Sequence, residues 1–98
     1  MSEEPKKNPN QGEAFQMDFS AFILSLNASA LIHLGEIPDP QSRERTVNLL
    51  SAKHTIEILE IIKDKTRGNL EGEEEKLLDD ILFNLRMKYV QNVSSKKK

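Results

Sequence analysis

The segment FSAFILSLNASALIHLG, from Phe19 to Gly35, contains no Asp, Glu, Lys or Arg, although such residues make up 31% of the chain. The segment reads as a helix. Placing its residues at intervals of about 100° leaves apolar or small side chains on every side of that helix. A helix of this kind is stable when it is buried all round. This segment therefore constrains the fold more than any other.

Helix start and stop signals divide the chain into three helices. Asp18 is a suitable N-cap for a helix over about 18–34, and Gly35 supplies the positive φ that ends it. A second helix is expected over about 48–67, and a third over about 72–92. Lysine and arginine near the C-termini of the second and third helices, and glutamates at the N-terminus of the third, match the helix macrodipoles.

No stretch alternates with a period of two residues, so the sequence predicts an all-α fold without a sheet. Residues 1–16 are polar and predict a disordered N-terminal tail, because they offer too little apolar area to offset the entropy of ordering. Residues 17–93 form the predicted helical domain. Residues 94–98, SSKKK, predict a disordered basic C-terminal tail.

The apolar surface of the three helices exceeds what one small bundle needs. The second helix has an apolar arc of more than roughly 200°, against about 100° for packing on a single core. The third helix has a main apolar face and a second stripe of Phe83, Met87 and Val90. Burying this surplus between copies predicts a helical bundle completed by homo-oligomerisation, most simply a dimer. The expected interface consists of Phe19, Phe22, Leu26, Ala28, Ile32, Phe83 and Met87.

Two other uses of the first helix stay open at this point. The same surface could dock a different protein, in which case the chain would be an adaptor that is monomeric when free. Membrane insertion fits less well, because Phe19 to Leu34 is shorter than the roughly 20 residues that span a bilayer. The segment also carries Asn27 and His33.

Composition argues against several classes of function. The formal charge is −2, which gives no sign of nucleic-acid binding. The chain has no cysteine, so it has no disulfide framework or thiolate zinc site, and this fits a cytoplasmic protein. The start of the chain has no apolar run of the kind found in secretory signals.

The residues that could carry chemistry do not assemble into a site. His54 and Glu57 lie one helical turn apart and could share a metal ion. A di-iron bundle, however, needs a Glu-x-x-His pair from each of two helices. Here the histidine precedes the glutamate, and the chain has only one such pair. His33 reads as a packed side chain, because it lies on the bulky face of the first helix. That face consists of Phe19, Phe22, Ile23, Leu26, Ala30 and Leu34. We therefore expect no enzymatic activity, no metal and no cofactor.

The loop GEIPDP, which follows the first helix, has two interpretations. Its prolines make it a stiff connector. Alternatively it is a rigid recognition loop that offers acidic groups to a basic partner. Its residues are Glu36, Ile37, Pro38, Asp39 and Pro40.

The blocks MDFSAFILSL, SALIHLGEIPDP and KTRGNL resemble a small bacterial, all-helical family catalogued as a domain of unknown function. The resemblance covers roughly Met17 to Val90. It implies a short helical fold and assigns no activity and no functional residues. Similar sequences tend to have threonine or serine after GNL, a good N-cap, whereas this chain has Glu71 followed by Gly72.

These observations together predict a non-enzymatic interaction or structural module that self-associates through its first helix.

Overall fold

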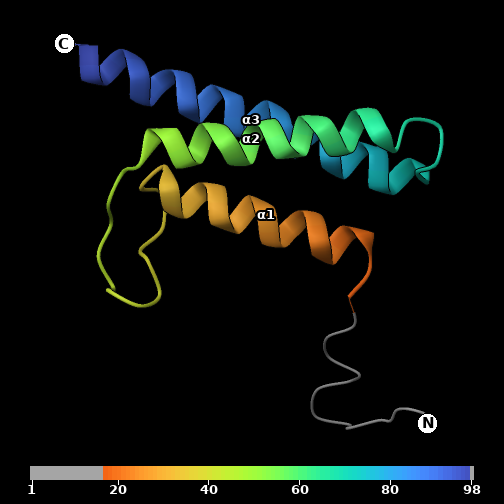
Figure 1. Ribbon diagram of the computed structural model, residues 1–98, viewed down its shortest axis with the longest axis horizontal. Helices are drawn as coiled ribbons and strands as arrows, with labels where there is room; N and C mark the ends of the chain where they lie inside the picture. Colours follow the sequence, from red (N-terminus) through yellow and green to blue (C-terminus); the bar gives the residue numbers. More distant parts are fainter. Residues whose placement is uncertain (1–16, 98) are drawn as a thin grey trace, which may run out of the picture.

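The computed structural model describes residues 17–97 and consists of three α-helices (Figure 1). Within that range no residue belongs to a β-strand, so the predicted all-α class is confirmed. The predicted tail over 1–16 lies outside the described residues. None of the helices in the described range is both long enough and apolar enough to cross a membrane.

Helix α1 spans Phe19–His33 and begins and ends as its sequence predicts. The side chain of Asp18 accepts a hydrogen bond from the backbone N–H of Ala21 at 2.8 Å, which satisfies one free donor of the first turn. Leu34 is the C-cap, and Gly35 follows with φ of 79°. The N–H of Glu36 donates to the carbonyl of Leu31 at 2.9 Å and closes the helix end.

Helix α2 spans Leu49–Lys65, slightly inside the predicted bounds. Its N-cap is Asn48, whose side chain accepts from the N–H of Ser51 at 3.1 Å. The hydroxyl of Thr66, the C-cap, donates to the carbonyl of Ile62 at 2.7 Å. Gly68 then turns the chain with φ of 81°.

Helix α3 spans Gly72–Lys97 and starts where the sequence predicts. The carbonyl of Glu71 accepts the first helical hydrogen bond, from Glu75 N–H, at 2.9 Å. The side chain of Glu74 reaches back and accepts from the N–H of Glu71, also at 2.9 Å. This is the second half of a capping box, and it shows how the helix begins without a serine or threonine N-cap.

The predicted end of the third helix, at about residue 92, was wrong. The helix continues to Lys97 and includes most of the segment predicted as a tail. No glycine or proline follows Gly72, so nothing in the sequence stops the helix.

The helices alternate in direction, so α2 runs antiparallel to α1 and to α3, and α1 runs parallel to α3 (Figure 1). Each helix packs against both others. The connection from α2 to α3 is a short turn, whereas residues 34–48 make a longer excursion between α1 and α2. The molecule is a three-helix bundle whose core lies between all three helices.

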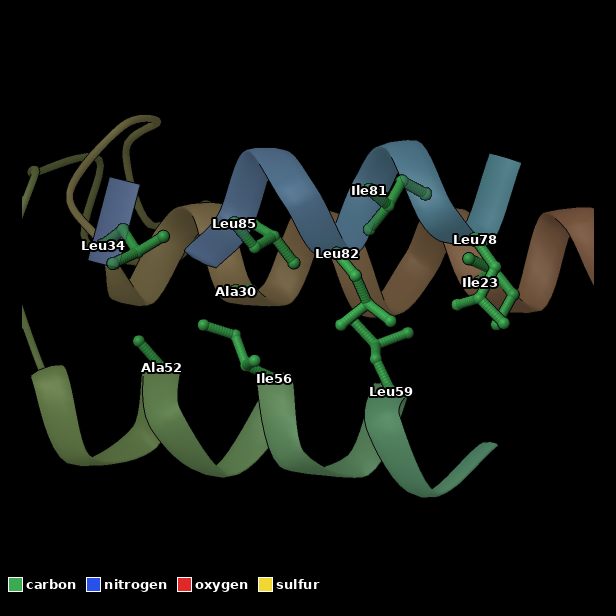
Figure 2. Packing of buried hydrophobic residues seen from close by; sticks show 10 residues of the cluster. All are labelled: Ile23, Ala30, Leu34, Ala52, Ile56, Leu59, Leu78, Ile81, Leu82 and Leu85. Carbon is green, nitrogen blue, oxygen red and sulfur yellow. The ribbon is translucent and has the colours of Figure 1, made fainter. Parts of the chain in front are cut away.

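The core is almost entirely aliphatic. Figure 2 shows the α2 side chains Ala52, Ile56 and Leu59 pointing toward the side chains of α1 and α3. Ile23, Ala52, Leu59 and Leu85 are completely buried. The full set of buried apolar residues is Ile23, Ala30, Leu34, Ala52, Ile56, Leu59, Leu78, Ile81, Leu82 and Leu85.

One polar side chain of α1 lies on the same face as the core residues. Asn27 lies four residues after Ile23 and three before Ala30, which is the spacing of a core-facing helical stripe. Its Oδ1 is buried and has no hydrogen-bond partner among residues 17–97. Burying a carbonyl oxygen without a partner costs about 1–3 kcal/mol, so this position opposes the stability of the bundle.

Candidate interaction surfaces

The outer face of α1, opposite the core, is apolar or small throughout and carries no charge. Helical spacing places on it Ala21, Phe22, Leu24, Ser25, Ala28 and Ile32. Phe22 is 42% and Leu24 49% exposed, and Ser25 and Ala28 are also exposed. The bundle therefore covers only one side of this helix.

The predicted interface residues of α1 divide between the core and this outer face. Phe19 and Leu26 pack against the core cluster and are half-buried, so they belong to the bundle interior. Phe22 and Ala28 are exposed on the outer face, and Ile32 is half-buried there. The predicted residues divide in this way because Ile23, Ala30 and Leu34 point into the core, so residues on the same side of α1 are buried and those on the opposite side are exposed.

The predicted stripe on α3 is exposed but lies elsewhere. Phe83 is 67%, Met87 45% and Val90 59% exposed. These residues point away from the core side of α3, which carries Leu78, Leu82 and Leu85. Beside the stripe, a shallow depression between α2 and α3 is crossed by Arg86, which donates to Glu60 at 2.8 Å. Phe83 and Met87 are thus not part of the outer face of α1.

Helix α2 carries a third set of exposed apolar side chains. Leu50 is 64%, Ile58 45% and Ile61 58% exposed. The sequence predicts a wide apolar arc on this helix, but the expected interface did not include these residues. The width of that arc was the signal that pointed to them.

The acidic groups of the GEIPDP loop are engaged within the chain. Glu36 accepts from the ammonium group of Lys88 on α3 at 3.2 Å. The Asp39 carboxylate accepts from the N–H of Gln41 at 2.7 Å, and the Asp39 N–H donates to the carbonyl of Glu44 at 2.9 Å. These contacts fold the loop back on itself and support its interpretation as a connector. Ile37, Pro38 and Pro40 are exposed.

The histidines lie apart from any group of ligands. His54 and Glu57 are both exposed on α2, and His33 is half-buried at the end of α1. Among residues 17–97 no three His, Asp or Glu side chains come together in a way that could hold a metal ion. The carbonyl of His33 accepts from the N–H of Asn48 at 2.7 Å.

The chain belongs to the family described as Domain of unknown function (DUF1844), which it matches over residues 16–91. The match covers all of α1 and α2 and most of α3. It confirms the resemblance that the sequence motifs indicated. Neither a curated protein nor a solved structure matches the chain.

Proposed function

We propose that this protein is a non-enzymatic helical module that self-associates through the outer face of α1, most simply as a two-fold dimer. The observation that carries the proposal is that α1 lacks a polar side. With Ile23, Ala30 and Leu34 buried in the bundle, Phe22, Leu24 and Ala28 still face solvent. A helix that is apolar or small on both faces favours a second layer of protein over water.

The absence of charge favours a second copy of the chain as the occupant. In a two-fold interface each residue lies near its own symmetry mate or near the mate of a neighbour, so like charges would repel. The outer face of α1 contains no charged residue, so no such repulsion arises between two copies. A face built to recognise a charged partner would instead carry complementary charges.

Sedimentation velocity from low micromolar concentrations upward tests the proposal. The wild-type chain is expected to form a discrete, reversible dimer. Ala28→Glu is expected to shift it to monomer, because it introduces a charge at the centre of the face. Glutamate is nearly as good a helix former as alanine, so α1 itself should persist, and circular dichroism checks this.

Phe83→Glu is the matched control, because it also places a glutamate at an exposed apolar position. It lies outside the outer face of α1 and is expected to leave the dimer intact. A wild-type chain that is folded and monomeric over the whole range would refute self-association. The same face would then serve the adaptor alternative, in which it binds a different protein.

A further inference from the structure

The ion pairs of the described residues mark two of the three sides of the bundle as polar. The side between α2 and α3 carries Lys63 with Asp79, and Arg86 with Glu60. On the side between α1 and α3, Lys88 reaches Glu36, just beyond the end of α1. Asp80, Asn84 and Lys88 recur on α3 at four-residue spacing, so α3 borders the outer face of α1 with a polar row.

The side between α1 and α2 is different. Ile58 lies about 140° around α2 from Lys63 and about 160° from Glu60, given 3.6 residues per turn. Those two residues contact α3, so Ile58 points to the flank of α2 next to α1. It is 45% exposed there, and Ile61 and Leu50 extend the apolar surface outward. No ion pair between described residues joins α1 to α2.

The outer face of α1 alone is too small for a stable interface. Specific interfaces bury roughly 800 Å² on each partner and use about 20–30 residues a side. One face of a helix of 15 residues provides only a fraction of that number. The interface must therefore continue onto a neighbouring helix. On α2 it meets the exposed apolar residues Ile58, Ile61 and Leu50, with His54 and Lys65 beside them, whereas α3 offers only the polar row of Asp80, Asn84 and Lys88.

Resting on the self-association proposed above, we infer that the interface continues from α1 onto α2 through Ile58, with Ile61 and Leu50 at its edge. Two copies then share a four-helix unit built from α1 and α2 of each. Helix α3 lies on the outside of each copy, and its Phe83 stripe stays exposed. The occupant of the α1 and α2 side is a second copy of this chain.

Paired substitutions test this arrangement on the full chain. Ile58→Glu is expected to raise the dimer dissociation constant about tenfold or more, because each copy would bury an unpaired carboxylate. Ile58 is partly exposed in the single chain, so the monomer fold is expected to persist. Phe83→Glu is expected to leave the dissociation constant within about twofold of wild type.

A spin label gives a second readout that does not depend on a destabilising charge. The chain has no cysteine, so Ile58→Cys and Phe83→Cys each carry the label at one position. On dimerisation the label at position 58 is expected to become immobilised, whereas that at position 83 stays mobile.

The outcomes separate the two proposals. If Ala28→Glu dissociates the dimer while Ile58→Glu and the label at 58 have no effect, the extension onto α2 is overturned, and the interface combines α1 with a different surface. If Phe83→Glu dissociates the dimer instead, the interface lies toward α3 and the inference fails. If wild type is monomeric, or Ala28→Glu leaves a wild-type dimer intact, the proposed function itself fails.

Discussion

The backbone N–H of Asn48 donates to the carbonyl oxygen of His33 at 2.7 Å and joins the end of α1 to the start of α2. The Asn48 side chain also caps α2 by accepting from the N–H of Ser51. One residue thus closes the long connection between the two helices and begins the second. Its main-chain and side-chain contributions can be separated by mutation.

Asn48→Ala is expected to lower the free energy of unfolding by about 1 kcal/mol, because it removes the cap and keeps the main-chain bond to His33. Urea denaturation followed by circular dichroism measures the change. Asn48→Asp retains an acceptor at the N-cap and is expected to stay near wild type. Equal losses in both variants would mean that the cap is not the source of the stability.

Gly35→Ala is expected to destabilise the chain for two reasons. Gly35 has φ of 79°, and an added Cβ would lie 2.8 Å from Cγ2 of Val47. Gly68 has φ of 81° but open space around it, so Gly68→Ala measures the backbone cost alone, about 1–2 kcal/mol. Thermal unfolding of both variants should show the larger loss at position 35. A loss at position 35 no larger than that at position 68 would rule out a cost from the contact with Val47.

Glu71→Thr is expected to stabilise the protein by about 0.5–1 kcal/mol. The Glu74 side chain already accepts from the N–H at position 71, and a threonine hydroxyl could accept from the N–H of Glu74 to complete the capping box. The melting temperature reports the gain. In the Glu74→Ala background the gain should shrink, and an unchanged gain would show that the two halves do not act together.

Asn27→Leu is expected to raise the free energy of unfolding by about 1–3 kcal/mol, because it replaces a buried oxygen without a partner by apolar atoms of similar size. Chemical denaturation provides the measurement, and Asn84→Leu at an exposed position of α3 is the control. Destabilisation by Asn27→Leu would show that the amide is satisfied in solution, for example by a water molecule.

Local signals were sufficient to predict the three helices. Asp18 and Gly35 define the ends of α1 through capping geometry that depends only on neighbouring residues. The wide apolar arc of α2 could also be predicted, but not which part of it, with Ala52, Ile56 and Leu59, faces the core. The end of α3 could not, because a polar tail without glycine or proline carries no local stop signal.

Two features depend on tertiary packing: which face of α1 points into the core, and which exposed apolar residues lie on the same surface of the bundle. Phe22 shares the bulky face with Ile23, yet Ile23 is buried in the bundle whereas Phe22 is exposed. A helix without charges does not indicate which apolar residues point inward. Phe83 was assigned to the same interface as the α1 residues because all of them are apolar residues beyond the number that one small core can bury. Their separation depends on how the helices are arranged around the bundle, which periodicity within one helix does not encode. Self-association itself stays a prediction.

The lack of charge on α1 has a thermodynamic consequence. An interface made from that helix would be held by the release of water from apolar surface, so added salt would change its affinity little. Burial of that surface lowers the heat capacity, and the enthalpy of association would become more favourable on warming. Titration calorimetry at several temperatures would therefore show a steep negative slope of enthalpy, a signature that an interface held by ion pairs would not give.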